Sequence, residues 1–135
     1  MSYTAELLRR QVRDRATERC EYCHVRSMNR LKPHEVDHIY AEKHGGQTNE
    51  NNLCLSCYYC NHYKGSDLCS LDPETGTLIA LYHPRQDHWE EHFRLTGATI
   101  IPLTASGRVT ARLFRMNDLE RILEREMLIR LNLYP

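Results

Sequence analysis

Apolar residues recur at helical spacing at both ends of the sequence. Near the N-terminus, Leu8, Val12 and Ala16 are four residues apart, and arginines fill much of the space around them. This spacing predicts a helix over residues 4–18 with one apolar side. Near the C-terminus, a capping pattern at residues 117–120 predicts the start of a closing helix. The side of that helix expected to face the core consists of Leu119, Ile122, Leu123 and Met127.

Shorter apolar runs separated by turn residues occupy the centre of the sequence. They predict short strands at residues 36–40, 53–55, 77–83 and 99–103. Paired glycines predict a loop at 45–46, and the string D-P-E-T-G predicts a turn at 72–76. Further helices are expected over residues 87–95 and 104–114 and from about residue 61. This mixture, without a repeat or linker, predicts an α+β protein built as a single small domain over residues 1–135.

The composition is that of an ordinary globular protein. The 135 residues are 41% hydrophobic and 27% charged. This length is typical of a single domain. No apolar stretch approaches the roughly 18 residues that a membrane span requires, so no membrane partner is expected. The N-terminal segment lacks the apolar core and cleavage site of a secretory signal, and we therefore expect a cytoplasmic protein.

A net charge of zero conceals an uneven distribution along the chain. Residues 1–32 hold eight basic and four acidic side chains, a net charge of +4. Residues 33–76 hold two basic and seven acidic side chains, a net charge of −5, and residues 77–135 carry +1. A basic arm beside an acidic centre is expected of a protein that grips phosphates and holds a cation, although a solvated helix face produces the same arm.

Four of the six cysteines form two C-x-x-C pairs, Cys20 with Cys23 and Cys57 with Cys60, separated by 33 residues. Each such turn directs two thiolates to one point, and two turns complete a tetrahedral zinc site. Four thiolates leave no open coordination position, so we expect a structural Zn²⁺ that closes the loop between the pairs. The alternatives are a disulfide or a redox pair, but a redox pair is expected singly near a βαβ unit, which this sequence lacks.

An ordered string of polar motifs lies between and after the cysteine pairs. The first C-x-x-C is followed by D-H-I, then G-G, then N-L-x-L-x-C-x-x-C-N-x-x-K. Over about residues 20–66 this string resembles the HNH nuclease family, whose fold is the ββα-metal motif. The matching residues are Cys20, Cys23, Asp37, His38, Ile39, Gly45, Gly46, Asn52, Leu53, Leu55, Cys57, Cys60, Asn61 and Lys64. The resemblance implies a nuclease core stapled by the zinc site, with residues 77–135 as a sheet-and-helix extension of unknown role.

The resemblance implies a catalytic role for several of these residues. His38 would be the general base, and Asn52 would hold the loop that orients it. Asp37 and Asn61 would bind the catalytic divalent cation, with His62 as the alternative ligand if the register shifts by one residue. The residue types suit this chemistry, because histidine titrates near neutrality and hard cations prefer oxygen ligands. Adjacent side chains on a regular strand point to opposite faces, so Asp37 and His38 would need an irregular strand to act on one phosphate.

The resemblance also implies DNA as the substrate and Mg²⁺ or a similar divalent cation as the catalytic cofactor. Lys64 would contact phosphate, and Arg9 and Arg13 on the basic arm would help to hold the DNA. The pattern describes one active site, so the chain could nick DNA alone or cut both strands as a homodimer.

Two other interpretations remain open from the sequence. Residues 34–38 read H-E-V-D-H, which matches the H-E-x-x-H signature of zinc proteases, but that chemistry requires a helix and this segment has the pattern of a strand. The chain could also be a non-catalytic zinc module that binds nucleic acid or a protein through its basic arm.

Overall fold

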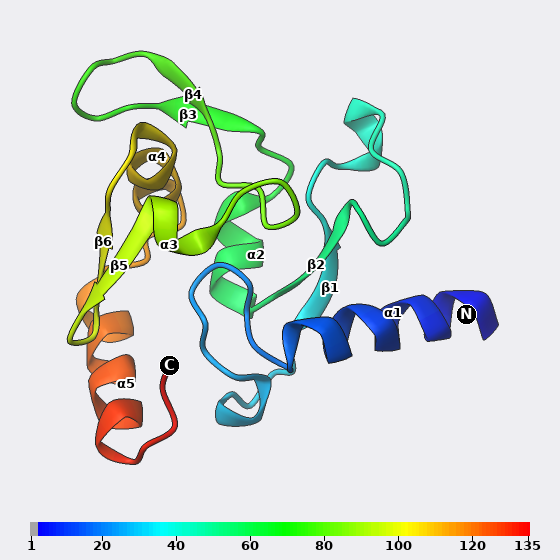
Figure 1. The fold of residues 1–135 in the computed structure, drawn as a ribbon, viewed down its shortest axis with the longest axis horizontal. Coiled ribbons are helices and arrows are strands. Elements are labelled where there is room, and N and C mark those ends of the chain that lie inside the picture. The colour runs from blue at the N-terminus through cyan, green and yellow to red at the C-terminus, as the bar shows by residue number, and fades with distance from the viewer. Residues whose placement is uncertain (1–2) are drawn as a thin grey trace.

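The N-terminal half of the protein is built around a two-stranded hairpin that lies between two helices (Figure 1). In this computed structural model, which describes residues 3–135, strand β1 (Glu35–His38) pairs antiparallel with β2 (Leu53–Ser56). Helix α1 (Tyr3–Ala16) precedes the hairpin, and helix α2 (Tyr58–Lys64) follows it. The order β1, β2, α2 confirms the predicted ββα element, although α2 begins three residues earlier than expected.

Side chains alternate in direction along each strand of the hairpin, so neighbouring residues face different helices. Leu53 and Leu55 pack against Val12 of α1 in a small apolar cluster. Cross-strand partners share a face of the hairpin, and Asp37 pairs with Cys54 rather than with either leucine. Asp37 therefore belongs to the other face, with Glu35, to which α2 donates a hydrogen bond.

The C-terminal half contains two small hairpins and three helices (Figure 1). The elements are β3 (Cys69–Leu71), β4 (Leu78–Ala80), α3 (Trp89–His92), β5 (Phe93–Thr96), β6 (Thr99–Pro102), α4 (Ala105–Leu113) and α5 (Leu119–Arg130). Two 3₁₀ turns, η1 (Ser27–Asn29) and η2 (Glu42–His44), lie in the loops of the first half. As predicted, Thr104 caps α4, its hydroxyl accepting the N–H of Gly107 at 3.0 Å.

The helix predicted over residues 87–95 is wrong beyond its first turn. Helix α3 ends at His92, and the chain continues as β5, paired with β6. Phe93 is 1% exposed and Leu95 is half-buried, whereas Arg94 between them is exposed. This two-residue period outweighs the capping pattern at residue 87, because burying Phe93 in the core is worth more than another helical turn.

The closing helix α5 is present, but its buried side is not the predicted one. Leu119 is 71% exposed, and Leu123 and Met127 are each 51% exposed. The buried side chains of α5 are Arg121, Arg125 and Leu128. The interior beside α5 contains carbonyl oxygens and sulfur atoms that need donors, and the two guanidinium groups supply them.

One hydrophobic core joins the two halves of the described chain. It includes the four C-x-x-C cysteines and large side chains of the C-terminal half. Tyr22, between the first two cysteines, packs edge to face on Phe114 with the ring centroids 4.9 Å apart. Near the C-terminus, the hydroxyl of Tyr134 donates to the carbonyl of Cys23 at 2.7 Å. No helix among residues 3–135 has the length and apolar character needed to cross a membrane.

Residues 35–38 of the H-E-V-D-H segment form strand β1 rather than a helix, which removes the protease interpretation. Its two histidines also differ in environment, since His34 is fully buried and His38 is not. His34 Nε2 lies 2.7 Å from the carbonyl of Val25, and its backbone N–H donates to Ser27 Oγ. Burial lowers the pKa of His34, so the neutral ring is the form that fits the fold.

Stability should therefore fall as the pH drops below about 6.5, the ordinary pKa of histidine. The unfolded chain binds a proton there that folded His34 resists, so protonation favours unfolding. Between pH 6.5 and 8 this contribution should be constant. Urea unfolding of the metal-loaded protein at pH 7.5 and 5.5 measures the effect. His34→Gln, which keeps an N–H donor for Val25, should flatten the pH dependence, and an unchanged slope would contradict the assignment.

Candidate active site and metal centre

The four paired cysteines meet at one buried point. The sulfur atoms of Cys20, Cys23, Cys57 and Cys60 lie within 4.8 Å of one another, and all four residues are fully buried. The sulfurs of Cys23 and Cys57 are 3.7 Å apart. Ligands about 2.3 Å from a tetrahedral zinc lie about 3.8 Å from each other, so this spacing suits a metal ion. The cysteines are free thiols in the described structure.

Local geometry and electrostatics also favour a cation at this point. Each C-x-x-C turn donates a backbone N–H to its own first sulfur, from Cys23 to Cys20 and from Cys60 to Cys57. Burial raises the pKa of Cys20, whereas hydrogen bonds from the neighbouring thiols lower the pKa of Cys23. A bound cation would stabilise all four sulfurs as thiolates, because its charge offsets their mutual repulsion.

A second polar cluster lies between β1 and α2. Glu35 and Asp37 are two residues apart on the strand and share a face, because side chains alternate along β1. Asn61 Nδ2 of α2 donates to Glu35 Oε2 at 3.1 Å. Two carboxylates and an amide are a donor set that suits a hard divalent cation. His62 is exposed and its ring stacks on Tyr58, with centroids 5.8 Å apart. Asn61 therefore contacts β1, whereas the ring of His62 packs on a side chain of its own helix.

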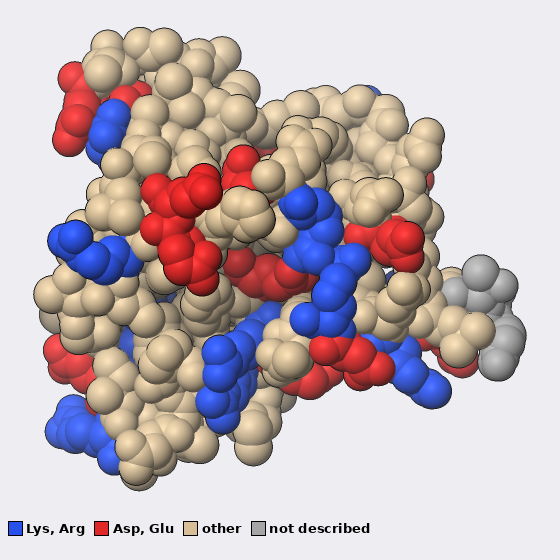
Figure 2. Space-filling view, viewed as in Figure 1, with Lys and Arg blue, Asp and Glu red and all other residues tan. Residues whose placement is uncertain are grey.

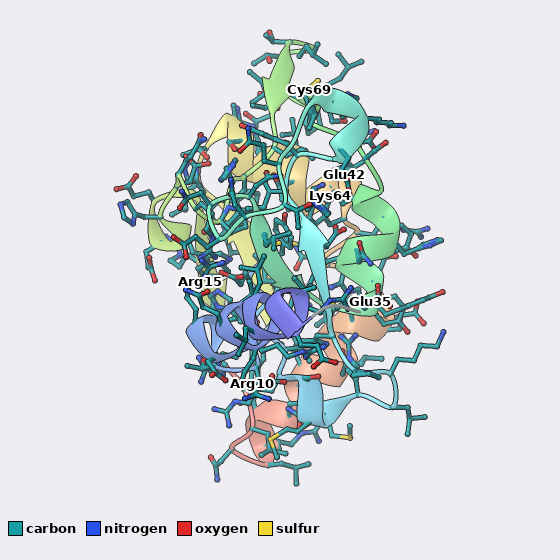
Figure 3. The ribbon with its side chains drawn as sticks, turned by 90° about the vertical axis from the view of Figure 1, so that its right-hand side faces the viewer. Arg10, Arg15, Glu35, Glu42, Lys64 and Cys69 are labelled. Atoms are coloured by element: carbon teal, nitrogen blue, oxygen red, sulfur yellow. The ribbon has the colours of Figure 1, made fainter. Side chains whose placement is uncertain are left out.

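Lys64 lies inside the protein rather than on the surface. It is 3% exposed, and its Nζ donates to the carbonyls of His38 at 3.3 Å and Gly65 at 3.4 Å. Burial raises the pKa of Asp37, and the charge of Lys64 opposes that rise. In Figure 3, Glu35 lies beside α2, in agreement with the hydrogen bond that it accepts from Asn61. These contacts tie α2 to the end of β1, and they leave the predicted contact of Lys64 with phosphate without support.

His38, at the end of β1, turns its ring toward the loop that connects β1 to β2. Its Nε2 lies 2.8 Å from Thr48 Oγ1 and 3.6 Å from Glu42 Oε1. The side chain is 26% exposed, so the ring remains within reach of solvent. In the tautomer with the proton on Nε2, Thr48 Oγ1 accepts that proton and the Nδ1 lone pair is free to accept another.

Asn52 fastens the two ends of the same loop. Its Oδ1 accepts the N–H of Tyr40 at 2.9 Å, and its Nδ2 donates to the carbonyls of Tyr40 and Gln47 at 2.9 and 2.8 Å. Gly46 passes so closely that a Cβ there would lie 1.8 Å from the Tyr40 carbonyl oxygen. These contacts are those expected of a residue that holds the loop around His38.

Asn52→Ala should lower the free energy of unfolding by about 2–3 kcal/mol, because it removes three hydrogen bonds to part-buried backbone groups of the loop. Urea denaturation checks this value. Asn51→Ala is the matched control, since Asn51 is exposed and its substitution should change stability by less than about 0.5 kcal/mol. Equal stability of the two variants would show that the Asn52 bonds do not hold the loop.

The basic helix α1 is only partly available to a ligand. Arg13 donates to the carbonyl of His34 and lies 3.4 Å from Glu18, while Arg15 donates to the carbonyls of Glu50 and Leu53. Arg9, one turn before Arg13, is exposed. On the face shown in Figure 2, basic and acidic side chains are interspersed rather than separated into one basic surface. The +4 arm thus serves partly to attach α1 to the hairpin.

Comparison with known proteins identifies the segment that carries both clusters. The sequence model of the HNH endonuclease family matches residues 20–67. The matched segment is about a third of the chain and is referred to as the HNH domain. Its boundaries enclose both C-x-x-C turns, both strands of the first hairpin and the whole of α2. The searches of curated proteins and of solved structures returned no match.

The match agrees with the resemblance that the sequence motifs indicate over about residues 20–66. Together with the cysteine cluster it supports a metal-binding α+β domain of nuclease type. The residues 3–135 contain no second group of three or more metal-binding His, Cys, Asp or Glu side chains with ligand atoms as close as those of the cysteines.

The sequence did not predict a role in the site for three polar residues that lie beside Asn61 or His38. Glu35 shares a face with Asp37, and strand alternation two residues apart was a signal that could have found it. Thr48 and Glu42 contact His38 from the connecting loop. No motif marks these two, because their approach depends on how that loop folds back.

Proposed function

We propose that the protein is a metal-dependent HNH endonuclease that hydrolyses phosphodiester bonds in DNA. The observation that carries the proposal is the arrangement around β1. An accessible histidine is fixed at one end of the strand, and oxygen donors lie between the strand and α2. We also propose that residues 1–135 act as one nuclease domain, because core residues of the HNH domain and of the C-terminal half pack in one cluster.

In the proposed reaction His38 takes a proton from the attacking water at Nδ1. Thr48 and Glu42 hold the ring through Nε2, so the basic nitrogen keeps one direction. Asp37 and Asn61 would hold Mg²⁺ or a similar divalent cation, with Glu35 as a further oxygen donor beside Asn61. When bound, that cation supplies neutralising charge at the phosphate and at the departing 3′-oxygen. The strand is regular through His38, which pairs with Leu53, so His38 and Asp37 leave β1 on opposite faces, and the His38 ring reaches the connecting loop from its own face.

The cysteine cluster has a structural role in this proposal. We assign it one Zn²⁺, since four buried sulfurs match its preferred ligands and leave no position for substrate. Exposed Arg9 is the better candidate for a contact with DNA, because the donors of Arg13 already meet protein groups. Free thiols suit a reducing compartment such as the cytoplasm.

Cleavage of supercoiled plasmid DNA with Mg²⁺, Mn²⁺ or Ni²⁺ tests the proposal. We expect nicked or linear product only when a divalent cation is added, and we expect Asp37→Ala to reduce cleavage strongly at each metal concentration. DNA binding without cleavage under every metal would instead identify a non-catalytic nucleic-acid module. Absence of both binding and cleavage would remove DNA as the substrate.

A further inference from the structure

A buried arginine of the C-terminal extension contacts the cysteine cluster. Arg121 lies on α5, well outside the HNH domain, and is 2% exposed. Its Nη2 donates to the sulfur of Cys60 at 3.2 Å and lies 3.9 Å from the sulfur of Cys57. Its Nη1 donates to the carbonyl of Phe114 at 2.7 Å. One guanidinium therefore links the second C-x-x-C turn to the end of α4.

The charges of Arg121 and of the cluster complement each other. Four thiolates around a divalent cation carry a net charge of −2, and burying that charge without a partner is unfavourable. A buried guanidinium has the same difficulty with the opposite sign. Among residues 3–135 no carboxylate lies within ion-pair distance of Arg121. The sulfur atoms of Cys60 and Cys57 are thus the anionic groups that it meets.

The extension also contacts the first C-x-x-C turn. Trp89 Nε1 of α3 donates to the carbonyl of Tyr22 at 2.9 Å, and the Tyr134 hydroxyl donates to the carbonyl of Cys23 at 2.7 Å. Both turns of the cluster therefore receive hydrogen bonds from residues beyond the end of the HNH domain at 67.

We propose that Arg121 is the outer-sphere partner of the metal-loaded cysteine site, and that metal retention depends on this contribution from the C-terminal extension. The inference rests on the metal assigned to the four cysteines under the proposed function. The hydrogen bonds to Cys60 and Cys57 hold the thiolates in place, and the guanidinium reduces the net charge of the centre from −2 to −1. Outer-sphere partners of this kind commonly change metal affinity by about 10- to 100-fold.

Zinc affinity of the full-length chain, measured by competition with a chromogenic chelator, tests the proposal. Arg121→Met removes the charge and the donors but keeps most of the side-chain volume, and we expect it to weaken zinc binding by about 10- to 100-fold. Arg125→Met is the matched control. Arg125 is fully buried one turn later, but its donors reach oxygens of Ala98, Met116 and Asn117 rather than sulfur. This control should lose stability but weaken zinc binding less than Arg121→Met does, because it touches no sulfur.

Equal affinities of Arg121→Met and the parent would overturn the proposal, as would an equal loss in Arg125→Met. If the methionine variants do not fold, Arg121→Lys and Arg125→Lys give the same comparison. Lysine keeps the charge but loses the two-nitrogen fork, so Arg121→Lys should bind zinc more weakly than Arg125→Lys, and equal affinities would count against the role. Elemental analysis of the parent distinguishes failure of the zinc assignment from failure of the role of Arg121. A parent without zinc would refute the zinc assignment. One zinc per chain, with unchanged zinc affinity in the variants, would refute only the role of Arg121.

Discussion

His38→Ala should reduce plasmid cleavage by about 100- to 10,000-fold, the range expected when a general base is removed. The residue ends a strand, is 26% exposed and contributes no group to the apolar core, so its loss should leave the fold intact. DNA binding should also persist, because the exposed arginines remain. The measurement is the rate of supercoil loss under single-turnover conditions with saturating divalent cation.

Two further variants separate the role of His38 from less specific effects. Thr48→Val removes one contact to Nε2 of His38 but leaves His38 itself in place. We therefore expect a smaller loss of cleavage rate than for His38→Ala. His88→Ala replaces an exposed histidine ahead of α3 and should cleave as the parent does. Equal cleavage by His38→Ala and the parent would refute the assignment of His38 and point to another source of activated water.

The parts of this site that could be predicted are those encoded by local spacing. C-x-x-C turns place two sulfurs together through their own backbone, and two such turns need only the hairpin between them to close the cluster. The ββα order also follows from short apolar runs that are adjacent along the chain. Asn52 is a similar case, since its three hydrogen bonds all reach residues within one loop.

The parts that could not be predicted depend on contacts distant in sequence. On helical periodicity α5 should bury Leu119, Leu123 and Met127, yet the helix turns Arg121 and Arg125 inward. Apolar burial alone would favour the predicted orientation. The interior contains acceptors instead: sulfur on one side, and the Ala98 and Met116 carbonyls on the other. The sequence of α5 does not predict these acceptors, because they belong to segments that come together only in the folded protein.

The same limit applies to Lys64 and Arg13. Both belong to patterns typical of phosphate contacts, one beside the second C-x-x-C turn and one on a basic helix. In the structure each donates to a backbone carbonyl at an end of β1: Lys64 to His38 and Arg13 to His34. Long cationic side chains can cap strands as well as bind anions, and sequence alone does not separate the two uses.

Removal of the metal from the cysteine cluster should unfold the protein. Structural zinc in small domains contributes about 10–16 kcal/mol of binding free energy near neutral pH. The net stability of a domain is about 5–15 kcal/mol, so the metal accounts for a share comparable to the whole. The cluster also lies inside the main core, where Cys20, Cys23, Cys57 and Cys60 are in contact with side chains of both halves of the chain. Without a cation, four buried thiols there would lose the bonds that hold the two turns together.

Cys60→Ser provides the sharpest form of this experiment, because it removes a metal ligand that also accepts from Arg121. We expect less than one zinc per chain by elemental analysis and loss of the cooperative thermal transition seen by circular dichroism. Cys69→Ser is the matched control, since Cys69 is exposed on β3 and lies outside the cluster. It should retain zinc and the parental Tm. A Cys60→Ser variant or a chelator-treated parent that melts at the parental temperature would show that the apolar core around Tyr22 and Phe114 suffices without metal.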